Sequence, residues 1–280
     1  MRFIDLHVHS TASDGTLTPT EVVERAIQHN LAAIALTDHD TVAGISEALA
    51  AGRNSQTTII PGIEVSCDYN ATEIHVLGFY LDYTSTELQE KLYTIRHARE
   101  KRNEDMIALF QKDDIPITME LLQNGNPKTV ITRAHFARVL MELGICKTKE
   151  QAFSRYIGTN CKYYLPKPVI TPEYALGLIT EAGGIPVLAH PLLYHLGYRQ
   201  VEDMITELMS YGLKGVEAYH SSNNIYESDR LRSIALRHNL ITTGGSDFHG
   251  QNKPDIDIGC GRGGLRITEH LLQPLKELRH

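Results

Sequence analysis

The chain contains 280 residues, of which 42% are hydrophobic and 22% charged, a composition that fits one large domain or one domain with an insertion. The net charge of −7 argues against a general attraction to nucleic acids or anionic membranes, so an anionic substrate would have to be held by local cations. The four cysteines form no C-x-x-C pair and no apolar run is long enough to span a bilayer, so we expect a cytoplasmic protein with reduced thiols that does not bind membranes.

Short apolar strands alternate with helices in the first 83 residues. Strands are predicted at residues 3–6, 31–36, 58–65 and 73–81. Thr18 and Glu21 are spaced as a capping box with Pro19 at the first helical position, which predicts a helix that ends near residue 30. A second helix is predicted to end near residue 51. This alternation predicts a parallel sheet with helical crossovers.

The pattern changes between residues 84 and 167, where no convincing strand is present. Thr84 and Glu87 have the spacing of a capping box and predict the start of a long helix. Further helices are predicted at residues 134–143 and 148–156. We therefore expect residues 84–167 to form a helical insertion domain with a small core of its own, carried by a barrel of residues 1–83 and 168–280.

Strands and helices alternate again in the last part of the chain. Strands are predicted at residues 185–189, 215–218 and 240–243, and helices at 172–182, 201–211, 226–238 and 268–278. Seven strands in total fit an α/β fold of the (β/α)7 barrel type, with an open doubly wound sheet as the alternative. The barrel is preferred because every polar cluster falls at the carboxyl end of a strand, where such barrels place their chemistry.

Histidines and acids recur at these strand ends. His7 and His9 are two residues apart, so on a strand their imidazoles point to the same face. A lone histidine at a strand end is often a packing or capping residue, but a buried crowd of unpaired ligands would be costly. Two or three divalent ions would resolve that cost, and Mn, Fe and Zn all fit. The candidate metal ligands are His7, His9, Asp14, His39, Glu64, His75, His190, Asp247 and His249.

The motifs around these ligands resemble those of the PHP (polymerase and histidinol phosphatase) family of metal-dependent phosphoesterases. The matching motifs are His7-Val8-His9, Thr37-Asp38-His39, Gly62-Ile63-Glu64, Glu73-Ile74-His75, Ala189-His190-Pro191 and Gly245-Ser246-Asp247-Phe248-His249. Together they cover essentially the whole chain, in order. The resemblance implies a distorted, TIM-like (β/α)7 barrel with a trinuclear metal centre.

Carried over residue by residue, the resemblance implies three ion positions. One would be held by His7, His9, Glu64 and Asp247, a second by Asp14, His39 and His249, and a third by Glu64, His75 and His190, with Glu64 bridging. Many relatives have histidine where this chain has Asp14. The carboxylate makes the ligand set of the second ion harder here and more suited to manganese. Glu64, His190, Asp247 and His249 are also the residues that we expect to act in catalysis.

Basic residues in the predicted insertion resemble the branch of the family that cleaves nucleoside 3′,5′-bisphosphates, some members of which also trim short 5′-phosphorylated RNA. Arg99 and Arg102 share a helix face, and Arg133 lies near a helix start. The plain alternative is a solvated basic face paired with nearby glutamates. In an acidic protein we expect instead that these arginines hold a second phosphate, away from the scissile bond. The predicted substrate-binding residues are Arg99, Arg102, Arg133, Ala134, His135 and His220.

The expected activity is hydrolysis of the 3′-phosphate of nucleoside 3′,5′-bisphosphates, such as pAp to AMP, by a metal-activated hydroxide. His220, His249 or a metal-bound water would protonate the leaving group. The alternatives among enzymes are a 5′–3′ exonuclease on short 5′-phosphorylated oligonucleotides, a histidinol-phosphate-type phosphomonoesterase and an amidohydrolase-type C–N hydrolase. The alternative outside enzymes is a binding module whose metals only stabilise the barrel. The expected partner is a small phosphorylated nucleotide, and the oligomeric state stays open.

Overall fold

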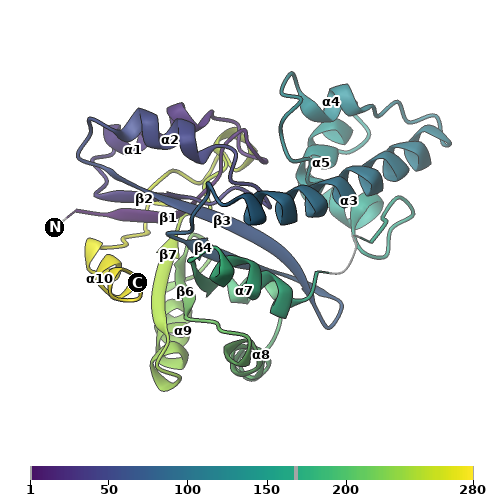
Figure 1. Ribbon diagram of the computed structural model, residues 1–280. Coiled ribbons are helices and arrows are strands. Elements are labelled where there is room, and N and C mark those ends of the chain that lie inside the picture. Colours follow the sequence, from purple (N-terminus) through teal and green to yellow (C-terminus); the bar gives the residue numbers. More distant parts are fainter. Residues whose placement is uncertain (1, 167–169, 280) are drawn as a thin grey trace.

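Seven strands form a continuous sheet in the computed structural model, which describes residues 2–166 and 170–279 (Figure 1). The strands are β1 Ile4–Val8, β2 Ala33–Leu36, β3 Thr58–Tyr69, β4 Thr72–Phe79, β5 Ile185–Leu188, β6 Gly215–His220 and β7 Ile241–Gly245. They are neighbours in chain order. The segment after β7 also bonds to β1, because the N–H of His9 donates to Phe248 O and the N–H of Asp247 donates to His7 O, each at 2.9 Å. The sheet is thus nearly closed, which confirms the predicted barrel class.

Strand β4 runs antiparallel to both β3 and β5, whereas the other neighbouring strands are parallel. The prediction of a parallel sheet with helical crossovers is wrong here, because a two-residue turn and not a helix joins β3 to β4. Asn70 and Ala71 form this turn with φ of 51° and 62°, the left-handed values of the favoured hairpin turns. The reversal places His75, near the start of β4, at the same rim as the carboxyl ends of the parallel strands.

Helices cover the outside of this sheet. They are α1 Pro19–Gln28, α2 Ile45–Gly52, α7 Pro172–Glu181, α8 Tyr198–Ser210 and α9 Ile225–Arg237. The capping box of Thr18 and Glu21 is confirmed, since each side chain accepts the backbone N–H of the other residue. The last predicted helix is shorter than expected: a 3-10 turn at Glu269–Leu271 precedes α10 Leu272–Glu277. Leu275 of α10 packs into the apolar cluster that contains Leu6, Phe79 and Val187 from the strands.

The described residues between β4 and α7 form helices and no strand, as predicted. The helices are α3 Thr86–Gln111, α4 Met119–Gln123, α5 Arg133–Glu142, α6 Lys149–Ala152 and a π-helical turn η1 Phe153–Ile157. Ser85, and not the predicted Thr84, caps α3: the Ser85 side chain accepts the N–H of Leu88, whereas Thr84 donates to Asp82. None of the described helices combines the length and the apolar composition that crossing a lipid bilayer requires.

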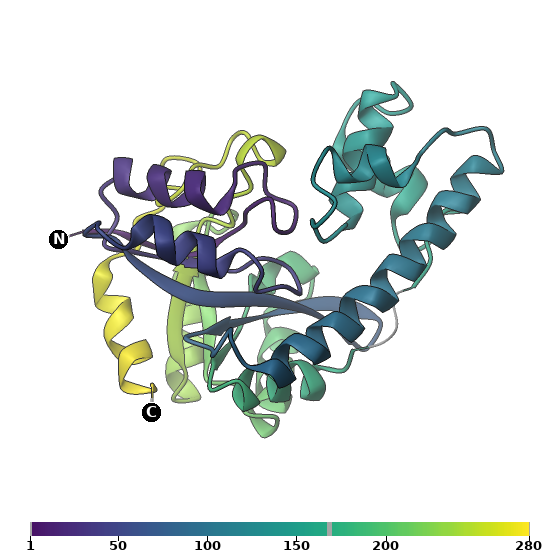
Figure 2. The same cartoon turned by 45° about the horizontal axis from the view of Figure 1, so that its top comes forward.

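The helical region has an apolar cluster of its own and lies over one end of the barrel. Phe110, Phe136 and Leu140 are among the buried members of that cluster. The region contacts the loop after β1, where the N–H of Val130 donates to Ala12 O at 3.1 Å (Figure 2). We retain the division into a barrel (1–83 and 168–280) and a helical insertion domain (84–167) as a proposal that this separate cluster supports. Its second boundary, at residues 167 and 168, lies outside the described residues.

Candidate active site

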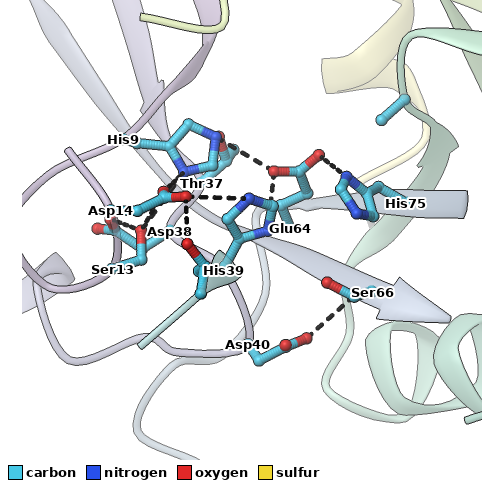
Figure 3. A network of polar contacts seen from close by, with 12 residues as sticks. His9, Ser13, Asp14, Thr37, Asp38, His39, Asp40, Glu64, Ser66 and His75 are labelled. Carbon is cyan, nitrogen blue, oxygen red and sulfur yellow. Dashed lines mark hydrogen bonds and ion pairs between the residues drawn. The ribbon is translucent and has the colours of Figure 1, made fainter. Parts of the chain in front are cut away.

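All nine predicted metal ligands converge on one rim of the barrel, as Figure 3 shows for His9, Asp14, His39, Glu64 and His75. Their nitrogen and oxygen atoms fall into four overlapping groups, and within each group the ligand atoms lie within 4.8 Å of one another. The groups are His9, Asp14, His39 and His249; His7, Glu64 and His190; His7, His9 and Asp247; and His39, Glu64 and His75. The second ion position that the family resemblance implies recurs here with His9 added, and the first recurs without Glu64. The third is divided, because Glu64 groups with His75 and His39 in one set and with His190 and His7 in another.

Glu64 is the carboxylate at the centre of this arrangement. Its Oε1 lies 2.8 Å from His75 Nδ1 and 3.0 Å from His190 Nε2. Its Oε2 lies 3.3 Å from His7 Nε2, 3.1 Å from His9 Nε2 and 3.2 Å from His39 Nδ1. The two oxygens thus face different sets of imidazoles, so Glu64 would contribute to more than one of these groups if they hold metal ions. Glu64 lies within β3 and not at a strand end, because β3 continues to Tyr69.

Asp14 and Asp247 also bring carboxylate oxygens close to the imidazole of His9. Asp247 Oδ1 lies 3.7 Å from His7 Nε2 and 3.6 Å from His9 Nε2. His249 lies between the two acids, with Nδ1 3.3 Å from Asp247 Oδ1 and Nε2 3.2 Å from Asp14 Oδ1. Asp14 Oδ2 is 3.9 Å from His39 Nε2. Each acid therefore has at least two imidazoles within reach of a shared cation.

The backbone at two of these residues is in the left-handed region. His190 has φ of 23° and Asp247 has φ of 58°. Residues other than glycine rarely adopt such values, and the cost of holding them there is often found at functional sites. The close approach of β7 to β1 adds a further constraint, since a Cβ at Gly245 would lie 2.2 Å from the Cβ of His7. The chain thus accepts local backbone strain at His190, after β5, and at Asp247, after β7.

The ionisation of these groups follows from their mutual contacts. Burial would raise the pKa of Glu64, but His39, His7 and His75 hold it well below its usual value, and nearby histidines do the same for Asp14. The pKa of Asp247 is likewise held well below its usual value, first by Lys253 and then by histidines. Burial would lower the pKa of His7, but Glu217 and Glu64 raise it well above its usual value. Burial lowers the pKa of His39. The acids are therefore ionised at neutral pH, as metal ligands must be.

The hydrogen bonds around His7 and His9 show that this donor set fits a metal. His7 Nδ1 donates to Glu217 Oε1 at 3.0 Å, and His9 Nδ1 faces Ser13 Oγ at 3.4 Å, whose own proton goes to Asp38. In the neutral rings, the lone pairs are then on the two Nε2 atoms, which lie only 3.1 Å apart. Two lone pairs at this distance need a cation between them, either a proton or a metal ion. The mixed nitrogen and oxygen set suits divalent Mn, Fe or Zn.

A basic pocket of about 200 Å³ adjoins this cluster. The arginines come from the helical region, Arg99 and Arg102 from α3 and Arg133 from α5. The described lining consists of Asp14, His39, Ser66, Glu73, His75, Arg99, Arg102, Thr132, Arg133, Ala134 and Phe153. Three cations and three candidate metal ligands thus share one pocket, although they lie far apart in the sequence.

Arg99 and Arg102 are buried, so the alternative of a solvated basic face is wrong for this pair. Arg99 forms an ion pair with Asp40, yet the Nε atoms of both arginines have no hydrogen-bond partner among the described residues. Burial and the charge of Arg102 lower the pKa of Arg99 to about 9, and burial and Arg133 lower that of Arg102 to about 10, so both stay charged at pH 7. Crowded cations with unused donors are stabilised by an anion.

Arg133 is held between two aromatic rings. Its guanidinium carbon lies 5.7 Å from the centre of the Phe153 ring and 5.5 Å from that of Tyr164. Its Nη2 is 3.3 Å from Glu73 Oε1. Contacts with the rings fix the guanidinium plane and leave its edge as the part that can bind a ligand. Phe153 is the first residue of the π-helical turn η1, a type of irregularity that is frequent at functional sites.

Comparison with known proteins agrees with this geometry. The family model described as PHP domain matches residues 5–210. The chain belongs to the PHP domain family. It is 34% identical over 261 residues to the 3′,5′-nucleoside bisphosphate phosphatase of Chromobacterium violaceum, covering 92% of this chain and 91% of that protein. It is 34% identical to the 5′-3′ exoribonuclease Rnm of Escherichia coli, covering 91% and 87%.

A solved structure confirms the PHP type of barrel over nearly the whole chain. The crystal structure of a candidate metal-dependent phosphoesterase from Bifidobacterium adolescentis has a TM-score of 0.86 at 30% sequence identity, and the match covers 99% of this chain and 96% of that one. The family that the sequence motifs resemble is thereby confirmed.

Three further residues predicted to bind substrate in this PHP protein have distinct positions. Ala134 lines the basic pocket. His135 is buried and acts as a helix cap, because its Nδ1 accepts the N–H of Thr132 at 3.0 Å. His220 Nδ1 accepts the N–H of Ser222 at 3.1 Å, so in the neutral ring the proton is on Nε2, which donates to Asp247 Oδ2 at 3.3 Å. His220 therefore orients Asp247, and the substrate-binding role of all three remains a prediction.

The residues that hydrogen-bond to the candidate metal ligands of the PHP centre were not predicted from the sequence. Glu217 accepts from His7 and also from the N–H of His190 at 2.8 Å. Asp38 accepts from the hydroxyls of Ser10 and Ser13 at 2.7 and 2.6 Å. Such outer partners fix the tautomer and direction of the ligands. The available signal for Glu217 was an acid among the apolar residues 215–218, because a carboxylate in a buried strand needs a partner.

Proposed function

We propose that this PHP protein hydrolyses the 3′-phosphate of nucleoside 3′,5′-bisphosphates, such as adenosine 3′,5′-bisphosphate to AMP. The observation that carries the proposal is the shared pocket, in which the buried Arg99 and Arg102 and the partly buried Arg133 lie beside three of the candidate metal ligands. A substrate with two phosphates can satisfy both parts of such a pocket at once, whereas a monophosphate can satisfy only one. The name of the Chromobacterium violaceum relative supports the same substrate class.

In this proposal the arginines hold the 5′-phosphate. Arg133 presents its edge from between Phe153 and Tyr164, and Arg99 and Arg102 contribute charge and their unused N–H groups. Arginine suits a terminal phosphate because its planar fork can donate two hydrogen bonds to one group. The binding energy gained there holds the 3′-phosphate near the histidines, so the reaction becomes effectively unimolecular.

The nine rim residues would hold two or three divalent ions, with Mn, Fe or Zn as the candidates. Such ions supply Lewis acidity and a bound water of lowered pKa. The chain itself places the ligands: Glu217 fixes His7, Ser13 and Asp38 fix His9, and His220 fixes Asp247. Glu64, His190, Asp247 and His249 are the residues that we expect to act on the reacting phosphate. The reaction forms a new P–O bond to water and breaks the P–O3′ bond, with a proton passing to O3′.

A second candidate activity is the removal of 5′-nucleotides from short 5′-phosphorylated oligonucleotides. The Escherichia coli relative named as an exoribonuclease favours it. Cleavage between the first and second nucleotides breaks the same P–O3′ bond, with the 5′-phosphate held by the same arginines. The two activities therefore differ only in what is attached to the phosphorus on the side away from O3′.

Product analysis tests the proposal. The protein, loaded in turn with Mn, Fe and Zn, is given adenosine 3′,5′-bisphosphate, a 5′-phosphorylated dinucleotide, histidinol phosphate and p-nitrophenyl phosphate. We expect AMP to be released from the first substrate with the highest kcat/KM. A preference for histidinol phosphate or p-nitrophenyl phosphate would contradict the proposal, and the absence of hydrolysis with every metal would favour a binding module.

A further inference from the structure

Two lysines that the proposed function does not use meet beside Asp247. Lys253 belongs to the turn that follows β7, and its Nζ lies 2.5 Å from Asp247 Oδ2. Lys149 comes from α6 in the helical region, and its Nζ donates to the backbone oxygen of Asn252, the residue before Lys253. The side chain of Asn252 donates to Asp14 O at 2.7 Å. Two distant segments thus bring two ammonium groups to the same edge of the candidate metal centre.

This edge differs from the arginine pocket, although Asp14 borders both. The described residues that line the pocket include His39 and His75 but neither Asp247 nor His249. Lys253 instead contacts Asp247 directly, and His249 lies between Asp247 and Asp14. The candidate metal centre therefore has cations on two flanks, with arginines beyond His75 and His39 and lysines beyond Asp247.

Asp247 is the acidic partner of Lys253, so the lysine pair becomes electrostatically unfavourable when cations at the rim take up the charge of that carboxylate. Lys149 is partly buried, and its pKa is lowered by burial and by the charge of Lys253. Divalent ions at the rim would compensate Asp247 and Asp14 and would add positive charge to this edge. Each ammonium group has three N–H donors, and the hydrogen bonds described here use one of each. Lys253 is also accessible, with a side chain that is 32% exposed.

We propose that Lys149 and Lys253 bind the third phosphate of a 5′-phosphorylated oligonucleotide, one nucleotide beyond the phosphate at the metal centre. The inference rests on the proposed function. It identifies residues that would extend the activity from nucleoside bisphosphates to short oligonucleotides. A terminal phosphate carries up to two charges and suits the arginine fork, whereas an internal phosphodiester carries one charge and suits lysines, which bind as point charges. An oligonucleotide held this way extends across the rim from the arginines to the lysines.

Binding to analogues that cannot be cleaved tests the lysine pair without relying on activity. The probes are a 5′-phosphorylated dinucleotide and trinucleotide in which a CH2 group replaces the first bridging 3′ oxygen; only the trinucleotide has a third phosphate. Lys149→Gln removes one charge, Lys149→Arg keeps it, and Lys147→Gln is the matched control, since Lys147 is an exposed lysine two residues away. Titrations with the metal-loaded protein at several salt concentrations give Kd and its salt dependence.

We expect Lys149→Gln to weaken trinucleotide binding about fivefold more than dinucleotide binding, with little change for Lys147→Gln and recovery for Lys149→Arg. The slope of log affinity against log salt for the trinucleotide should fall by about 0.7 for the lost phosphate contact. Equal losses for the two probes, or equal effects of Lys149→Gln and Lys147→Gln, would overturn the third-phosphate site. A wild-type protein that neither hydrolyses adenosine 3′,5′-bisphosphate nor binds either probe would overturn the proposed function itself.

Discussion

At the rim of the barrel, six histidines face three carboxylates, whereas the adjoining pocket holds three arginines with Asp40 and Glu73 as their described acidic partners. Both regions are buried and polar. In the first, opposite charges and lone pairs point at one another and leave room for cations between them. In the second, like charges crowd together and leave N–H donors unused. The difference indicates that the fold prepares one region for metal ions and the other for a phosphate.

The largest effect is expected for Asp247→Asn in the histidine-rich region. The amide loses the charge that a divalent ion requires, so the variant should bind less metal and lose at least about 1,000-fold in kcat/KM. Elemental analysis and the phosphatase assay measure the two losses. Glu202→Gln is the control, because Glu202 pairs with Arg237 and His238 away from the rim. If Asp247→Asn bound its full complement of metal and turned over normally, the assignment of the histidine-rich region to metal ions would be wrong.

Asp40→Asn tests whether the arginine pocket lacks negative charge. The amide keeps an oxygen for the N–H of Ser66 but removes the charge that pairs with Arg99, so we expect a loss of about 3 kcal/mol in the free energy of unfolding. AMP should then raise the melting temperature of the variant more than that of the wild type, because its phosphate replaces the lost carboxylate. Asp229→Asn is the control, since it breaks a pair with Arg232 that is 56% exposed on both sides. A loss no larger than in that control, with no added response to AMP, would count against an anion site.

Arg133→Gln separates phosphate binding from chemistry. We expect KM for adenosine 3′,5′-bisphosphate to rise about 30-fold, from the loss of charged hydrogen bonds to the 5′-phosphate, while KM for p-nitrophenyl phosphate changes little. Arg155→Gln, at an exposed arginine of the same region, serves as the control. Steady-state kinetics on both substrates provide the comparison. Equal losses on both substrates would show that Arg133 does not distinguish the second phosphate.

The smallest effect is expected for His135→Gln in the helical region, where the pH dependence of the free energy of unfolding should change. Burial lowers the pKa of His135 to about 4, whereas in the unfolded chain it is near 6.5. The unfolded state therefore takes up the proton first, and the native state loses stability as the pH falls from about 6.5 toward 4. Glutamine can keep the capping contact with Thr132 without titrating. Between pH 7 and pH 5, we expect the free energy of unfolding, measured with urea, to fall by about 1–2 kcal/mol less in the variant than in the wild type. Identical pH profiles would contradict a buried, neutral His135 at the helix cap.

The nine-residue cluster could be predicted because eight of its members sit in short motifs within or next to recognisable strands, and Asp14 follows the first of these motifs by five residues. Repetition of histidines and acids at successive strand ends was enough to place them on one rim. The hairpin of Asn70 and Ala71 was missed, since neither residue is glycine and the strand patterns on both sides resemble those of parallel strands. His75 was still placed correctly, because reversal of β4 exchanges the start of the strand for its end.

The supporting and flanking residues could not be predicted in the same way. Arg99 and Arg102 were recognised as a pair on one helix face, but their burial depends on contacts between elements, such as that of Arg99 with Asp40. Lys149 and Lys253 are single lysines with no local pattern, and they meet only because α6 packs against the turn after β7. Periodicity and spacing report on neighbours along one element, whereas these contacts arise between elements.

A crystal grown with Mn²⁺ and AMP would compare the two regions in one experiment, with anomalous scattering used to locate the ions. We predict anomalous peaks among the rim residues, at least one of them bound to Glu64, and the AMP phosphate on Arg99, Arg102 and Arg133. Manganese absent from the rim, or the AMP phosphate bound away from the arginines, would contradict the assignment of cations to one region and the anion to the other.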